Sequence, residues 1–155
     1  VLGFEQNGEK AIEWLKRAAD NGHPMAKNDL AVALFQGEEC KKDIALALKL
    51  FEEAAQEKVP NSLFSLGYIY YNGEVQKDKI KAAHYFLESA NLGYAPAMMN
   101  YGYMCASGDG IRKNLDDGLF WLLSAIENGE DGAMEYLTKY YKQNRRGEWV
   151  KKLFS

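Results

Sequence analysis

The chain has 155 residues, 47% of them hydrophobic and 26% charged, with a formal net charge of −3. A domain of this length can bury roughly 70% of the surface of its unfolded chain, so a stable core needs no disulfide or bound metal. No apolar run approaches the ~18 residues of a membrane span, so we expect no membrane insertion. Residues 139–155 hold six Lys or Arg and one Glu, and this net +5 leaves −8 on residues 1–138. Nucleic-acid binding would need more cations along one face, so a basic capping segment is the better interpretation.

Apolar residues recur at helical spacing along most of the chain. The first predicted helix covers 8–21 and ends at Asn21-Gly22, where glycine can adopt the left-handed conformation. Three helix pairs and one further helix follow it. The pairs are predicted over 24–36 and 43–56, over 60–72 and 78–91, and over 96–107 and 114–128, and the further helix over 132–142.

The predicted pairs share the residues that begin and end them. A proline lies in or near the first turn of each first helix, where a missing N–H group costs nothing. An Asp or Asn precedes each second helix and can accept a hydrogen bond from an N–H group of the first turn. The prolines are Pro24, Pro60 and Pro96, the capping residues are Asp43, Asp78 and Asn114, and Gly22, Gly93 and Gly129 close second helices, with Lys58 in that place once.

One motif repeats with a period of 35 or 36 residues. Leu66-Gly67-x-x-Tyr70-x-x-Gly73 returns as Tyr101-Gly102-x-x-Cys105-x-x-Gly108, and Leu30-Ala31-x-x-Leu34-x-x-Gly37 anticipates both. A period of this length indicates stacked helix pairs that present a surface, rather than one globular core.

This motif resembles the Sel-one-like repeat family, a relative of the tetratricopeptide repeats. The resemblance covers about residues 10–141 and is strongest in the repeat that contains Leu66-Gly67. It implies an all-α fold, a right-handed α-solenoid of antiparallel helix pairs, in a single domain over 1–155. The repeats would be 24–59, 60–94 and 95–130, preceded by a partial repeat over 1–23 and followed by a partial repeat and C-terminal cap over 131–155.

The last twelve residues depart from the repeat pattern. Trp149, Val150, Leu153 and Phe154 are apolar among basic residues. Terminal repeats must cover an open apolar end, so we interpret residues 144–155 as a degenerate second helix that caps the stack. Trp149, Leu153 and Phe154 are predicted to be buried against the last helix pair. The alternative interpretation is that these residues are the stub of a longer repeat array.

The resemblance implies that the first helix of each pair lines a concave groove. A partner protein or peptide would bind there, because rigid aromatic side chains are frequent anchors of interfaces. The alternative is that Tyr68 and Tyr103 only pack against the next helix. The last helix would offer Glu135, Lys139 and Lys142. The predicted binding residues are Asn28, Val32, Phe35, Phe64, Tyr68, Tyr71, Met99 and Tyr103.

No catalytic or cofactor motif is present in the sequence, so we expect a protein that is not an enzyme, with no cofactor and no metal. His23 and His84 have no Cys or carboxylate at a metal-binding spacing. Gly108-Asp109-Gly110 is interpreted as a turn. Cys40 and Cys105 occupy non-equivalent positions almost two repeats apart, so both are predicted to be free thiols.

The resemblance also implies a biological context. The family includes bacterial adaptor, virulence-associated and signalling proteins, so we expect an adaptor or regulatory role in a bacterium. A narrower alternative is an immunity protein that neutralises a toxin, and some cysteine-rich relatives suggest β-lactam binding or hydrolysis. A monomer is favoured. Free thiols favour a reducing compartment such as the cytoplasm, whereas removal of a leader would place the chain in the periplasm or outside the cell.

Overall fold

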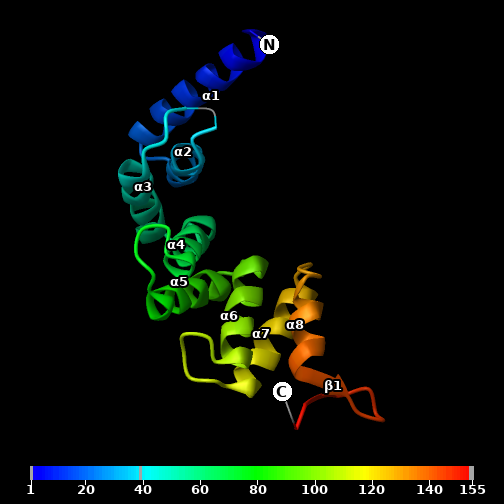
Figure 1. Ribbon diagram of the computed structural model, residues 1–155. Coiled ribbons are helices and arrows are strands. Elements are labelled where there is room, and N and C mark those ends of the chain that lie inside the picture. Colours follow the sequence, from blue (N-terminus) through cyan, green and yellow to red (C-terminus); the bar gives the residue numbers. More distant parts are fainter. Residues whose placement is uncertain (1, 39, 154–155) are drawn as a thin grey trace. The chain divides into compact units, whose positions relative to one another are not determined.

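The computed structural model describes residues 2–38 and 40–153, with side chains from residue 8 onward. Within this part of the chain, eight α-helices precede a two-stranded antiparallel hairpin (Figure 1). The chain divides into two compact units, residues 1–66 and 67–155, and the division falls within α4. The elements are α1 (Leu2–Asp20), α2 (Pro24–Gln36), α3 (Ile44–Gln56), α4 (Pro60–Asn72), α5 (Lys79–Asn91), α6 (Ala95–Ser107), α7 (Leu115–Glu127), α8 (Ala133–Tyr140), β1 (Tyr141–Gln143) and β2 (Trp149–Lys151).

The second helix of each pair begins at a capping side chain, as the sequence predicts. Asp43, Asp78 and Asn114 have extended backbone conformations directly before α3, α5 and α7. Their side-chain oxygens accept hydrogen bonds of 2.9–3.2 Å from backbone N–H groups of the first turn. These N–H groups have no carbonyl partner within the helix, so the caps fix where each second helix starts.

The second helices also end alike, with one exception in residue type. Gly93 follows α5 with φ +88°, and Gly129 follows α7 with φ +89°. The residue at this place after α3 is Lys58, with φ +61°. Among the described residues it is the only non-glycine with a positive φ. A side chain there is strained, because left-handed backbone brings Cβ close to the neighbouring carbonyl oxygen.

The core of the first unit lies between α1, α2, α3 and the start of α4. Ile12, Leu30, Leu34 and Phe51 are buried there. A polar contact joins α2 to the beginning of α4, because the buried Ser62 hydroxyl donates to the Asn28 side-chain carbonyl at 2.8 Å. Both polar groups are therefore satisfied inside the unit, as buried polar groups must be.

The core of the second unit runs from the end of α4 through α5, α6, α7 and α8. Phe86, Met104, Leu122 and Leu137 are fully buried in it. The absent side chain of Gly67 lets α4 approach α5 closely, since a Cβ there would lie 2.7 Å from the Phe86 ring. Figure 1 shows α6, α7 and α8 side by side with the hairpin at the end of α8.

The C-terminal segment forms a hairpin, so the prediction of a degenerate helix over 144–155 is wrong. Helix α8 ends at Tyr140, and β1 pairs with β2 so that Lys142 faces Val150 across the ladder. The turn depends on Asn144, whose side-chain oxygen accepts from the backbone N–H groups of Arg146 at 2.8 Å and Glu148 at 3.0 Å. An Asn side chain that satisfies the backbone in this way competes with helix formation.

The hairpin is anchored to the second unit by Tyr141 and by an ion pair between Lys151 and Asp116. The Tyr141 ring is buried, and its hydroxyl donates to the Leu115 carbonyl oxygen at 2.6 Å. Trp149 is half-buried, but Leu153 is 86% exposed, so the predicted burial of Leu153 is wrong. Phe154 lies outside the described residues.

Candidate partner-binding surfaces

The predicted binding residues of the first unit differ in how far a partner could reach them. Asn28 is only 5% exposed and its side chain packs between α2 and α4, so it offers little to a partner. Val32, Phe35 and Phe64 are half-buried. The Lys42 ammonium group lies 5.6 Å from the centre of the Phe35 ring, close enough for a cation–π contact.

Three of the four predicted residues in the second unit belong to a row of tyrosines on α4, α6 and α8. We define the tyrosine row as Tyr68, Tyr71, Tyr103 and Tyr136. Tyr68 is 51% exposed, and the other three side chains are half-buried. The ring centres of Tyr103 and Tyr136 are 4.8 Å apart. Met99, which is also half-buried, precedes Tyr103 by one helical turn.

A carboxylate fixes the middle of the tyrosine row. Asp109, in the loop between α6 and α7, accepts a hydrogen bond of 2.5 Å from the Tyr71 hydroxyl and pairs with the Lys79 ammonium group. Lys79 also lies 5.0 Å from the Tyr71 ring centre. Hydrogen bonds from Lys79 and then Tyr71 lower the pKa of Asp109, while burial and the Asp109 hydrogen bond raise the pKa of Tyr71 well above its usual range. The carboxylate is thus the favoured state of Asp109, and the phenol that of Tyr71.

Sequence reasoning missed Asp109 and Tyr136 at this surface. It interpreted Asp109 as part of a turn, and no local signal indicates that the loop reaches back to α4 and α5. It selected Glu135 and Lys139 of α8 and Lys142, which lies in β1. All three are exposed, while Tyr136, next to Glu135, contacts α6. These residues were selected because they are equivalent to the predicted binding positions of α4 and α6. The side chain of α8 that contacts α6 is instead Tyr136, one residue after the equivalent position Glu135.

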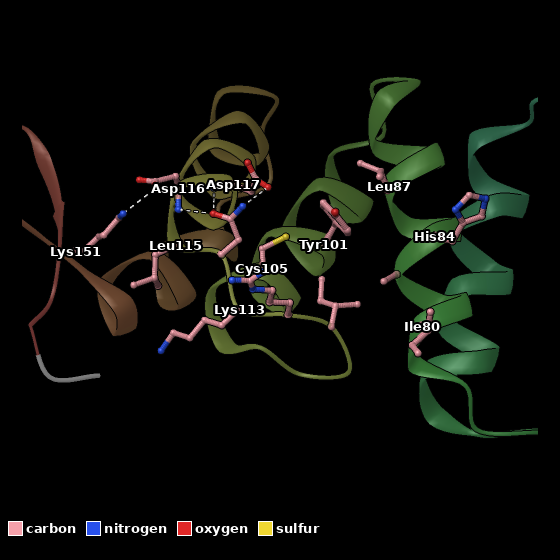
Figure 2. A pocket seen from close by; sticks show the side chains of 14 residues that line it. Ile80, His84, Leu87, Tyr101, Cys105, Lys113, Leu115, Asp116, Asp117 and Lys151 are labelled. Atoms are coloured by element: carbon pink, nitrogen blue, oxygen red, sulfur yellow. Dashed lines mark hydrogen bonds and ion pairs between the residues drawn. The ribbon is translucent and has the colours of Figure 1, made fainter.

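A pocket lies on the other side of α6. It is an open hollow of about 850 Å³ between α5, α6, the α6–α7 loop, the start of α7 and β2 (Figure 2). Tyr101 and Cys105 of α6 lie at its centre, and Ile80 and Leu87 line it from α5. This pocket was not predicted from the sequence, because it is formed by packing between repeats.

The described residues offer no evident metal site. No three His, Cys, Asp or Glu side chains in this part of the chain are placed to hold a metal ion. His84 instead lies 3.2 Å from Glu88, one turn later on α5. Cys40 and Cys105 are both free thiols. None of the described helices is long and apolar enough to cross a bilayer.

Curated relatives of this chain carry names that describe regulators. The chain is 33% identical over 107 residues to chitin synthase regulatory factor 3 of Schizosaccharomyces pombe, covering 68% of this chain and 12% of that protein. It is 30% identical over 141 residues to an exopolysaccharide production negative regulator of Rhizobium meliloti, covering 81% of this chain and 53% of the relative. The chain therefore spans about half or less of the length of these relatives.

Solved structures share the arrangement of helix pairs. A protective antigen of uropathogenic Escherichia coli with an SLR fold has a TM-score of 0.78 at 30% identity, covering 83% of this chain and 28% of the antigen. A Sel1 repeat protein from Oxalobacter formigenes has a TM-score of 0.74 at 24% identity, covering 81% and 96% of the two chains, and supports the fold alone. The all-α fold of a Sel1-like α-solenoid is thereby confirmed. The Sel1 repeat family matches residues 2–23, 24–59, 60–94 and 95–130, so the chain belongs to this family.

Proposed function

We propose that this chain is a non-enzymatic interaction module that binds a partner protein or peptide along the tyrosine row. The observation that carries this proposal is the accessibility of Tyr68 beside three further tyrosines on rigid helices. Tyrosine combines a large apolar ring with a polar tip and has few rotamers to freeze on binding. Met99 adds an adaptable apolar side chain to the same surface.

The names of the relatives support an adaptor or regulatory role. The two curated relatives described above are named for regulating chitin synthase and exopolysaccharide production. A non-enzymatic regulator can act by contacting another macromolecule, which agrees with the binding role that we propose. Because the chain matches only part of each relative, we propose the binding role for the repeats and infer no particular target.

The surroundings of Cys105 argue against this side chain as a catalytic nucleophile. Cys105 is buried, and burial raises the pKa of its thiol to about 11. The thiolate is the nucleophilic form, so this side chain is a poor nucleophile near neutral pH. A β-lactam hydrolysis assay on the intact protein checks the competing enzyme hypothesis, and turnover above the uncatalysed rate would contradict our proposal.

The binding proposal is tested with two variants at the row and a matched aromatic variant outside it. The partner is first captured from the native source on the immobilised protein, and its affinity is then measured for each variant. Tyr68→Ala and Tyr103→Ala should each weaken binding about tenfold or more, because a few anchors dominate most interfaces. Phe120→Ala removes a ring that is 60% exposed on α7 and should have little effect. Unchanged affinity in both tyrosine variants, with native helical content, would exclude the row as the binding site.

A further inference from the structure

The pocket beside α6 is separate from the tyrosine row. Successive residues of an α-helix are about 100° apart, so Tyr101 lies about 200° around α6 from Tyr103. Tyr101 lines the pocket, whereas Tyr103 contacts Tyr136 of the tyrosine row. A ligand in the pocket would therefore contact a different side of the second unit from a partner on the row.

The pocket has an apolar interior with an open wall. Ile80 is 73% exposed at one edge, and Leu87 and Ile111 are half-buried. Burial raises the pKa of Tyr101 to about 12 and that of Cys105 to about 11, so both groups at the centre are neutral near pH 7. An exposed isoleucine beside a hollow of about 850 Å³ offers an apolar contact without an enclosed chamber. This shape suits side chains of a protein segment better than a small molecule, which pockets usually enclose.

The carboxylates at the edge of the pocket already have partners. Asp116 pairs with Lys151 at 2.7 Å, and Asp117 accepts from the Asn114 amide at 2.6 Å (Figure 2). Arg112, by contrast, makes no hydrogen bond or ion pair with any described residue, although it lines the same pocket. The Asn114 amide is neutral, so Asp117 keeps its negative charge, but the Arg112 guanidinium is the charged group of this edge that has no partner among the described residues. A guanidinium binds carboxylates through paired hydrogen bonds.

The other cationic groups at the pocket are engaged elsewhere. His84 lies 3.2 Å from Glu88 on α5. Lys113 also lines the pocket, and its ammonium group lies 5.9 Å from the ring centre of Tyr140, a residue that does not line it. The lining holds the cations Arg112, Lys113 and Lys151 against the carboxylates Asp116 and Asp117, so its net charge is positive. Arg112 is the one of these cations that has no partner among the described residues.

From this arrangement we infer that the pocket is a second docking site, for a partner segment that presents an aliphatic side chain close to an Asp or Glu. The aliphatic side chain contacts Ile80 and Leu87 above the Tyr101 ring, and the carboxylate pairs with Arg112. Charge complementarity selects an acidic segment over a basic one, since like charges across an interface oppose binding. The inference goes beyond the proposed function, because it adds a site whose residues are absent from the tyrosine row.

A peptide library displayed on phage and selected on the intact protein tests this site without a known partner. Selected peptides should share an aliphatic residue near an Asp or Glu, and a synthetic copy should bind in a fluorescence polarisation assay. Ile80→Ser and Arg112→Glu should each weaken that binding about tenfold or more. Selection on Arg112→Glu should in turn favour Lys or Arg at the acidic position, a change that a merely structural role for Arg112 would not produce.

Control variants separate this site from the tyrosine row and from self-association. Tyr68→Ala and Leu92→Ala, both at exposed positions outside the pocket, should bind the selected peptide like the wild type. The inference is overturned if no sequence is enriched, if the peptides lack an acidic preference, or if Tyr68→Ala abolishes binding while Ile80→Ser does not. It is also overturned if sedimentation shows a dimer that Ile80→Ser dissociates, because a second copy of the chain would then be the occupant.

Discussion

The α2–α3 loop of the first unit and the α6–α7 loop of the second begin and end in the same way. Each starts with a left-handed glycine, Gly37 at φ +72° and Gly108 at φ +77°. Each ends with a capping residue, Asp43 or Asn114, whose backbone N–H donates to a carbonyl of the preceding helix at 3.0 Å or 2.8 Å. These local contacts close the helix pair, and they recur because each depends on only a few neighbouring residues.

The loops differ in what they contact beyond their own pair. In the second unit, Asp109 hydrogen bonds with Tyr71 and pairs with Lys79, so the loop is joined to the preceding repeat. The corresponding position after Gly37 is Glu38, which is exposed and makes no hydrogen bond or ion pair with a described residue. Two loops with the same backbone closure therefore differ at this position, where Asp109 joins its loop to the preceding repeat and Glu38 makes no such contact with a described residue. Three predictions address this difference between the loops, and a fourth tests the caps that the loops share. The fifth, with the smallest effect, concerns another difference between the units, at the ends of α3 and α5.

The largest effect is expected where the α6–α7 loop approaches Lys79. Gly110 has φ +82°, and a Cβ there would lie 2.3 Å from the Lys79 Cβ. Gly110→Ala should therefore lower the free energy of unfolding by about 2–3 kcal/mol, through left-handed strain and a steric clash together. Chemical denaturation measures this loss. Gly129→Ala is the control, because its φ is +89° but nothing lies within 4 Å of the added Cβ. Equal losses in the two variants would mean that the loop does not approach Lys79 closely.

The next effect concerns the carboxylate that joins the repeats. Asp109→Asn should lower the free energy of unfolding by about 1–2 kcal/mol at pH 7, because hydrogen bonds to a charged group are lost. Glu38→Gln, the equivalent change in the other loop, should cost almost nothing.

The same carboxylate should make stability depend on pH. Lys79 and then Tyr71 lower the pKa of Asp109 in the folded protein. Its contribution is therefore present above the pKa of an unfolded Asp, about 4, and is lost as the pH falls through the folded pKa. Between pH 5 and pH 3, the wild type should lose more stability than Asp109→Asn. Parallel curves for the two proteins would contradict the ionic contact.

Local signals made much of the fold predictable. The bounds of α2 and α4 agree with the predicted ranges 24–36 and 60–72, because a proline at the start and a glycine after the end mark each helix. The hairpin was not predicted, since its turn depends on the Asn144 side chain within a segment of mixed apolar and basic residues. Tyr136 and Asp109 were missed for a different reason. Their roles come from contacts between repeats, which a repeat pattern alone does not specify.

Removal of a helix-capping side chain should have a smaller effect, and an equal one in the two units, because a second helix in each unit begins at such a cap. Asp43→Ala and Asp78→Ala each remove the acceptor for the first turn of a second helix. Each should lower the free energy of unfolding by about 1 kcal/mol, as measured by chemical denaturation. Replacement by Asn keeps an acceptor and should restore most of the loss. No change in either Ala variant would mean that the helix starts do not depend on these side chains.

The smallest effect is expected at the ends of α3 and α5, where the two units differ by one residue. Lys58 holds a left-handed conformation with φ +61°, in the place that Gly93 occupies after α5. Lys58→Gly should raise the free energy of unfolding by about 0.5–1 kcal/mol, because relief of left-handed strain exceeds the entropy that glycine adds to the unfolded chain. The reverse change, Gly93→Lys, should lower stability, although a Cβ at Gly93 meets nothing within 4 Å. Opposite signs for the two substitutions in urea denaturation would assign the effect to backbone conformation alone. If Lys58→Gly instead destabilises the protein, the contacts of the Lys58 side chain outweigh its strain, and the end of α3 is stabilised differently from that of α5.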